Sequence, residues 1–222
     1  MKFLLVMVLV LMANFAKAQV APKNDFSPYW NASLSWLQKE AKQAGIEMRG
    51  VILPTDLEVV KDLLHMNKGE MLAATFYKDF KINDSQYPTC AMGRYSEADW
   101  GDWLSVMGEG REDWVRFWFV AHEWGHCLDM MEGGLTATST DSEKLRGERR
   151  ADAFAVLIMM FSTKSSDFVK RLAEQRERNM PGSSHDTGKV IRYFTTHKNV
   201  EIGGTMDKWW SLAKQITDEV YR

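Results

Sequence analysis

Two histidines and a glutamate stand at a spacing that suits metal chemistry. The segment 121–129 contains the pattern H-E-x-x-H, with His122 and His126 four residues apart and Glu123 directly after the first histidine. On an α-helix, residues i and i+4 lie on one face, so both imidazoles can reach one metal ion. Glu123 lies beside that face, where a carboxylate can take a proton from a metal-bound water. The pattern predicts metal-assisted hydrolysis, with Zn²⁺ as the usual ion.

The flanking residues predict that this motif lies on a largely buried helix over residues 113–132. The run 114–121 is too apolar for a solvated surface helix. Glu112 and Asp113 place negative charge in the first turn, where the helix dipole favours it, and the glycine pair 133–134 marks the end. Imidazole and carboxylate groups in a buried helix need polar partners, and a metal ion supplies them.

A hydrolytic zinc site usually has three protein ligands and one position for water. Glu148 is the best candidate for the third ligand. Thr140 and Glu143 form a capping-box pattern, which predicts a second helix over residues 142–161. Glu148 and Asp152 share one stripe of that helix, so Asp152 could accept the outer N–H of a ligand histidine and fix its tautomer.

These two motifs together resemble those of the gluzincin metallopeptidases. Glu148 comes 22 residues after His126, and Glu148-x-x-Ala151-Asp152 looks like the second motif of small bacterial zincins. The resemblance covers residues 113–162, about a quarter of the chain after residue 18. It implies the following site: zinc ligands His122, His126 and Glu148, general base Glu123, and Asp152 behind a ligand histidine.

Two related families fit less well. Metzincins need glycine three residues after the second histidine and histidine or aspartate six after it, where this chain has Asp129 and Glu132. Aspzincins carry a downstream G-T-x-x-D, and the segment 204–207 is one residue short of it. Thr205 fits better as the N-cap of a last helix, with Asp207 in its first turn.

Peptide hydrolysis also needs a donor for the tetrahedral oxyanion besides the metal. Related enzymes often place a histidine or tyrosine for this purpose downstream of the third ligand. His185 is the favoured candidate, because it lies in a loop that runs into a helix start, where a side chain can face a cleft. Tyr193 and His197 are the alternatives.

Residues 1–18 have the pattern of a signal peptide. Lys2 is followed by a continuous apolar run over 3–12, which is too short to span a bilayer, and Ala16-Lys17-Ala18 is an A-x-A cleavage site. The sequence therefore predicts export to the periplasm or the medium, with residues 19–222 as one domain and no stable membrane anchor. Removal of residues 1–18 takes away two of 28 basic residues and none of 30 acidic ones, which moves the net charge from −2 to −4. That balance gives no electrostatic case for nucleic-acid binding.

The chain has two cysteines, Cys90 and Cys127, and export makes a disulfide between them possible. Such a bond would tie the segment before the motif helix to the helix itself. Free buried thiols are the main alternative. The sequence is silent on oligomeric state.

The order of the elements predicts an α+β fold, with a small N-terminal sheet and a mainly helical C-terminal half. The resemblance implies that this sheet lies over the active-site helix, in a zincin-like arrangement, and that an edge strand binds the substrate backbone. Residues 71–77 and 87–95 are the candidates for that strand. The expected elements are strands at 48–53, 71–77 and 87–95, and helices at 31–44, 56–66, 99–107, 113–132, 142–161, 165–179, 186–197 and 205–221.

The leading hypothesis is an exported zinc metallopeptidase, favoured as an endopeptidase, that acts on a peptide or protein substrate. A zinc amidase acting on a cell-wall cross-link or another amide would use the same metal chemistry. A non-catalytic zincin-fold binding protein is the third alternative, although a binding module has no need for Glu123.

Overall fold

The computed structural model describes residues 27–48, 73–82, 85–94, 106–108, 110–136, 138–178, 181–183, 185–197 and 203–222. For residues 27–30 and for both strands it describes the backbone alone. The signal peptide at 1–18, the strand at 48–53 and the helices at 56–66 and 99–107 fall wholly or mostly outside these ranges, so they stay predictions.

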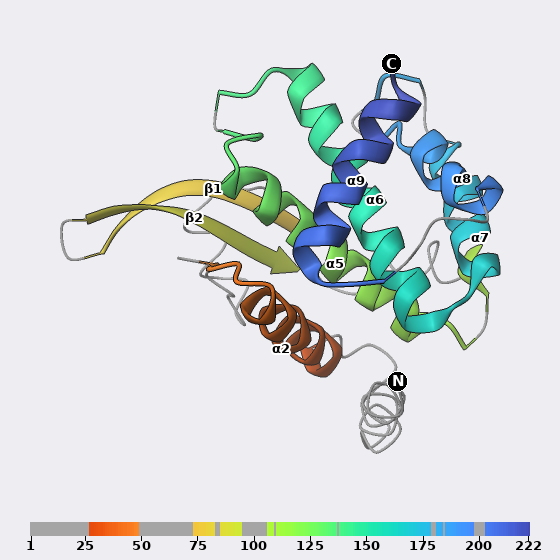
Figure 1. Ribbon diagram of the computed structural model, residues 1–222, viewed down its shortest axis with the longest axis horizontal. Coiled ribbons are helices and arrows are strands. Elements are labelled where there is room, and N and C mark those ends of the chain that lie inside the picture. Colours follow the sequence, from red (N-terminus) through yellow and green to blue (C-terminus); the bar gives the residue numbers. More distant parts are fainter. Residues whose placement is uncertain are drawn as a thin grey trace.

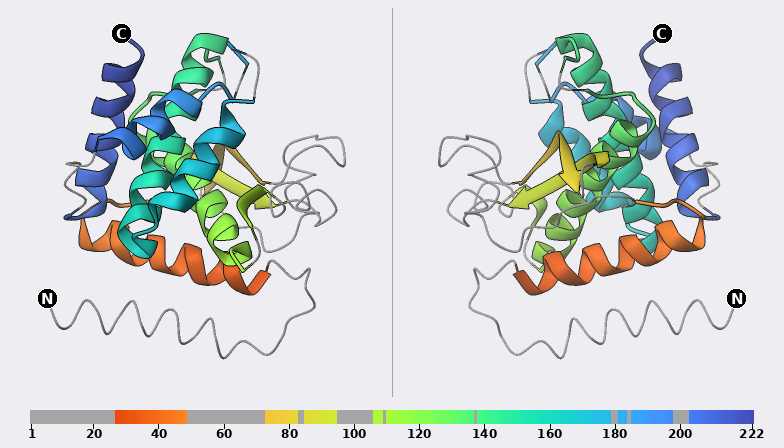
Figure 2. Two further views of the ribbon diagram at one scale, coloured as in Figure 1. Left: turned by 90° about the vertical axis from the view of Figure 1, so that its right-hand side faces the viewer. Right: turned by 90° about the vertical axis from the view of Figure 1, so that its left-hand side faces the viewer.

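Helix α2 (Ser27–Gln43) begins four residues before the predicted helix and ends where the sequence indicated. Its apolar residues Leu34, Leu37 and Ala41 recur at helical spacing and are buried. Gly45, with φ of 72°, ends the helix, and the N–H of Ile46 donates to the carbonyl of Ala41 at 2.8 Å. The helix runs beneath the other helices and contacts α5 and α9 (Figure 2).

Two strands, β1 (Ala73–Ile82) and β2 (Ser85–Arg94), form an antiparallel two-stranded sheet. Both predicted strands in this region are confirmed, and β1 continues five residues past its predicted end. The register places Tyr77 opposite Cys90. One end of the sheet lies against α5, and the rest extends away from the helices (Figure 1).

The motif helix α5 (Glu112–Met131) and the second helix α6 (Asp141–Thr163) match their predicted ranges within two residues. The predicted capping box begins α6: Thr140 Oγ1 accepts from the N–H of Glu143 at 3.3 Å, and Glu143 Oε2 accepts from the N–H of Thr140 at 2.7 Å. At the end of α5, Gly133 adopts φ of 75°, and the N–H of Gly134 donates to the carbonyl of Asp129 at 2.8 Å. This is the Schellman arrangement, which satisfies carbonyls that the helix leaves open.

Three further helices complete the C-terminal half: α7 (Ser166–Arg176), α8 (Gly188–Thr196) and α9 (Met206–Val220). All three were predicted. Helix α9 packs along α6, and α7 packs against α8 (Figure 1). Thr205 occupies the N-cap of α9 as predicted, but its hydroxyl bonds the Asp207 carboxylate instead of a backbone N–H.

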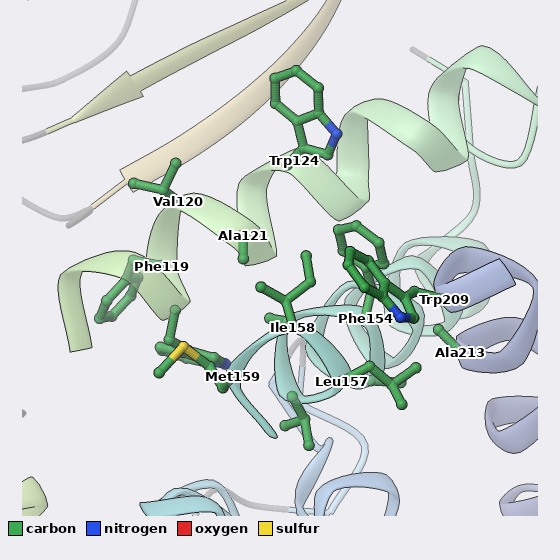
Figure 3. Packing of buried hydrophobic residues seen from close by; sticks show 14 of the residues in the cluster. Phe119, Val120, Ala121, Trp124, Phe154, Leu157, Ile158, Met159, Trp209 and Ala213 are labelled. Atoms are coloured by element: carbon green, nitrogen blue, oxygen red, sulfur yellow. The ribbon is translucent and has the colours of Figure 1, made fainter. Parts of the chain in front are cut away.

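The core lies between α5, α6 and α9. Ala121 of α5 points toward Ile158 of α6, whereas Val120 and Trp124 project from the opposite side of α5 (Figure 3). Phe154 meets Trp210 of α9 edge-on, with ring centroids 5.8 Å apart. Every residue of α6 from Ala151 to Met159 is fully buried, so α6 is the central helix.

The mainly helical C-terminal half is confirmed, because five helices follow residue 111 in the described part of the chain. The described N-terminal part contributes α2 and the two-stranded sheet. None of the helices in these ranges is both long enough and apolar enough to cross a bilayer.

The glycine at the end of α5 offers a test of this helix terminus. A Cβ at Gly133 would meet no atom within 4 Å. The only cost of Gly133→Ala is therefore the strain of alanine in the left-handed backbone conformation. We expect the free energy of unfolding to fall by about 1 kcal/mol, measured by urea denaturation followed by circular dichroism. Gly203→Ala is the matched control, since Gly203 also has open space but no positive φ. Equal losses in the two variants would contradict this account.

Candidate metal centre

Helices α5 and α6 bring the side chains of His122, His126 and Glu148 together. The Nε2 atoms of the two histidines lie 3.1 Å apart. Glu148 Oε2 lies 3.3 Å from His122 Nε2, and Glu148 Oε1 lies 3.4 Å from His126 Nε2. Each residue therefore offers one ligand atom to a shared centre, and these three residues form a group that could hold a metal ion.

The polar atoms of this group are incompletely satisfied by one another. Within the described ranges, Nδ1 of His126 is buried and makes no hydrogen bond, whereas Oε2 of Glu148 lies 3.3 Å from both His122 Nε2 and His185 Nδ1. His126 is 8% exposed and His122 is 4% exposed, so water does little to replace the missing partners. A cation bound at the centre would give both Nε2 atoms and the Glu148 carboxylate a shared partner within the buried site.

The Asp152 carboxylate contacts the ring nitrogen of His122 that faces away from Glu148. Its Oδ1 accepts from His122 Nδ1 at 2.8 Å, so Nδ1 carries the proton and Nε2 faces Glu148. Asp152 is completely buried, and two more side chains satisfy its carboxylate. Arg176 Nε lies 3.1 Å from Oδ2, and the Thr187 hydroxyl donates to the same oxygen at 2.5 Å. The three partners come from α5, α7 and the N-cap of α8.

These contacts shift the acid–base properties of the group. Burial alone would lower the pKa of His122, but the carboxylates of Asp152 and Glu148 outweigh it and raise that pKa to about 10. Burial would raise the pKa of Asp152, but Arg176, His122 and Thr187 lower it to about 2. Burial likewise opposes ionisation of Glu148, while the nearby imidazoles hold its pKa well below the usual range. In the metal-free protein both carboxylates are therefore ionised at neutral pH.

Glu123 is next to His122 on α5 and is 4% exposed. Directly after it, Trp124 and Gly125 are also buried in the contacts of α5 with its neighbours. Glu123 is therefore a buried carboxylate adjacent in sequence to one of the three candidate ligands.

His185 lies at the edge of the same group. Its Nδ1 is 3.3 Å from Glu148 Oε2, and its side chain is 49% exposed. The loop that carries it is held at Asp186: the N–H of Gly182 donates to the Asp186 carboxylate at 2.9 Å, and Arg149 donates to its carbonyl at 3.2 Å. The structure thus brings together all three proposed ligands, Asp152 and His185.

The alternative oxyanion donors, and the acidic residues considered in the comparison with metzincins and aspzincins, lie elsewhere. Tyr193 stacks on His197, with ring centroids 3.8 Å apart, and His197 Nδ1 lies 3.0 Å from the carbonyl of Tyr193. Glu132 pairs with Lys214 at 2.5 Å, and Asp207 bonds Thr205. None of these four side chains belongs to the group that could hold a metal ion in the described part of the chain.

Cys127 follows His126 on α5 and is disulfide-bonded. The sequence has one other cysteine, Cys90, whose backbone lies in β2. On that count we propose the pair Cys90–Cys127, which would fasten the sheet to the helix turn that carries His126.

Sequence reasoning did not single out Arg176 or Thr187. Arg176 is 5% exposed, and its guanidinium also lies 5.0 Å from the centre of the Trp118 ring. Thr187 is completely buried. Both occur in stretches rich in polar residues, so their burial has no local sequence signal; only the packing of α7 and α8 onto α6 brings them to Asp152.

No family model, curated protein or solved structure matches the chain. The interpretation of this group as a metal site therefore rests on its geometry.

The Asp152 carboxylate is the first target for a test. Asp152→Asn keeps the shape but leaves Arg176 buried without its counter-charge and weakens the hold on His122. We expect the free energy of unfolding to fall by about 3–5 kcal/mol and metal affinity to fall roughly 10–100-fold. Urea denaturation and chelator competition measure the two effects. Asp167→Asn is the control, because it breaks ion pairs to Arg111 and Arg171 that are solvent-exposed. Similar losses in both variants would argue against a special role for Asp152.

Metal uptake should also release a proton. With a pKa of about 10, His122 is protonated at pH 7 in the metal-free protein, and Nε2 must lose its proton before it can ligate a cation. The apparent metal affinity should therefore rise with pH up to about 10. Calorimetric titration at pH 7 in two buffers of different ionisation enthalpy gives the number of protons released. A heat of binding that is independent of the buffer would contradict this expectation.

Proposed function

We propose that this protein is an exported zinc-dependent peptidase that hydrolyses peptide bonds. The observation that carries the proposal is the convergence of His122 Nε2, His126 Nε2 and a Glu148 carboxylate oxygen, with distances of 3.1–3.4 Å between them. Glu123, the group that catalysis requires and mere binding does not, lies on the same helix.

The donor set fits zinc. Tetrahedral Zn²⁺ with bonds of about 2.0–2.1 Å to nitrogen and oxygen places neighbouring ligands about 3.3 Å apart. The three distances in this group are close to that value. Two imidazoles and one carboxylate are also a set used by catalytic zinc sites, which keep one position for water. Ca²⁺ and Mg²⁺ prefer oxygen ligands throughout and are poorly served here.

A zinc ion held by His122, His126 and Glu148 would lower the pKa of a bound water and polarise the substrate carbonyl. The other steps belong to the chain itself. Glu123 accepts a proton from the attacking water and later delivers it to the leaving amine. His185, half-exposed at the edge of the group, donates a hydrogen bond to the oxyanion that develops on the substrate. Asp152 keeps His122 in the tautomer that presents Nε2 to the metal.

The proposal that the protein is exported rests on the sequence of residues 1–18 alone. An apolar run followed by Ala16-Lys17-Ala18 supports cleavage before Gln19. A peptidase released outside the cytoplasm meets peptide or protein substrates there, and a disulfide at Cys127 suits such a location. The mass of the secreted protein tests the cleavage point directly.

The decisive experiment compares two variants of the purified protein. Glu123→Gln should keep the fold and one bound zinc but lose hydrolysis by about 100-fold or more, because the proton carrier is gone. Glu148→Ala should lose the zinc itself. Zinc content is measured by atomic absorption, and hydrolysis by mass spectrometry of a peptide library with and without a chelator. Normal proteolysis by Glu123→Gln would contradict the proposed mechanism.

The same assay separates the alternatives. The protein would be an amidase if it binds zinc and cleaves no peptide but releases amine from a cell-wall cross-link. Bound zinc with neither activity would leave a binding protein. Absence of stoichiometric zinc in the wild-type protein would overturn the metal site.

A further inference from the structure

Helices α5 and α6 approach each other closely beside the candidate ligands. A Cβ built on Gly125 of α5 would lie 2.8 Å from the Cα of Ala151 on α6, 3.2 Å from its Cβ and 3.4 Å from its carbonyl oxygen. Ordinary carbon–carbon contacts begin near 3.5 Å. Only glycine at position 125 therefore permits the observed separation of the two backbones.

This contact is located between the ligands from the two helices. Gly125 is three residues after His122 and one before His126, and Ala151 is three residues after Glu148. The ligand atoms that the two helices contribute are 3.3–3.4 Å apart. A metal site tolerates errors of only about 0.2 Å in its bond lengths. The separation of α5 and α6 at Gly125 thus decides whether Glu148 and the histidines can hold one ion together.

Neither helix can turn to make room for a larger residue. On one side of the contact, Asp152 bonds His122, and on the other side Arg150 donates to the buried Asp129 carboxylate at 3.0 Å. The obstructing atom is backbone Cα, which cannot move aside as the end of a side chain could. A Cβ at position 125 must therefore push the helices apart by roughly half an ångström or more.

We infer that Gly125 is a positioning residue that sets the distance between the ligands of α5 and the ligand of α6, and so determines metal affinity. This rests on the metal site of the proposed function but not on peptide hydrolysis. Helix propensity predicts the opposite effect on the stability of α5, because alanine stabilises a helix interior relative to glycine. A loss of metal affinity in Gly125→Ala with helix content retained would therefore report spacing.

The test measures zinc affinity of the purified protein by competition with a chromophoric chelator, and the ligand geometry by the visible spectrum of the Co²⁺-loaded form. Gly125→Ala should bind zinc roughly 10–100-fold more weakly, with altered Co²⁺ bands and unchanged far-ultraviolet circular dichroism. Gly147→Ala is the matched control on α6. Its Cβ would meet side-chain carbons of Leu135 (Cδ1 at 2.7 Å, Cδ2 and Cγ at 3.1 Å) and no backbone of α5, so its zinc affinity should match the wild type.

Each outcome decides a separate point. Zinc bound by the wild type and equally well by Gly125→Ala overturns this inference and leaves the proposed function intact. A wild type that binds no zinc overturns both. If Gly125→Ala fails to fold, Ala151→Ser decides, because it adds a single atom to the same gap from α6. Weaker zinc binding by folded Ala151→Ser supports the inference, and unchanged binding overturns it.

Discussion

The buried carboxylate of Asp152 is the constraint on which the arrangement of this structure depends. An ionised group with no exposure to water must be paired and hydrogen-bonded, or it costs several kcal/mol. Asp152 meets that requirement with His122 of α5, Arg176 of α7 and Thr187 at the start of α8. One charge on the central helix therefore fixes three neighbouring elements, and the candidate metal ligand is one of its partners.

Burial of these imidazole and carboxylate groups in a helical core costs free energy. His122, His126 and Glu123 are each less than a tenth exposed, and they share α5 with Trp118, Val120 and Trp124, which are fully buried. The cost is offset on the Asp152 side by a complete set of partners, including Arg176 against the Trp118 ring. On the opposite side, the Glu148 carboxylate lies within 3.4 Å of His122, His126 and His185.

Local sequence pattern was enough to predict part of this site. The i, i+4 spacing of His122 and His126 and the stripe shared by Glu148 and Asp152 follow from helical periodicity alone, and the capping box at Thr140 fixed the start of α6. Arg176 and Thr187 could not be predicted, because their burial results from tertiary packing and leaves no periodic signal. Gly125 did carry a signal that was not used: glycine in a helix interior is unfavourable, so it often marks a close approach of two backbones. Most strand and helix limits shifted by a few residues, since helix and strand ends depend on neighbours that the sequence does not display.

The exposure of the site residues indicates how a substrate would reach the proposed centre. On α5 the polar groups are almost closed off, whereas Glu148 is 18% exposed and His185 is 49% exposed. Of these residues, those most open to solvent are on α6 and on the loop before α8. A scissile bond that enters from this side meets His185 before it meets the histidines of α5. The loop is fixed through Asp186 and through Thr187, whose hydroxyl bonds Asp152. The proposed oxyanion donor His185 and the proposed zinc ligand His122 each lie 3.3 Å from Glu148 Oε2, so one carboxylate contacts both groups.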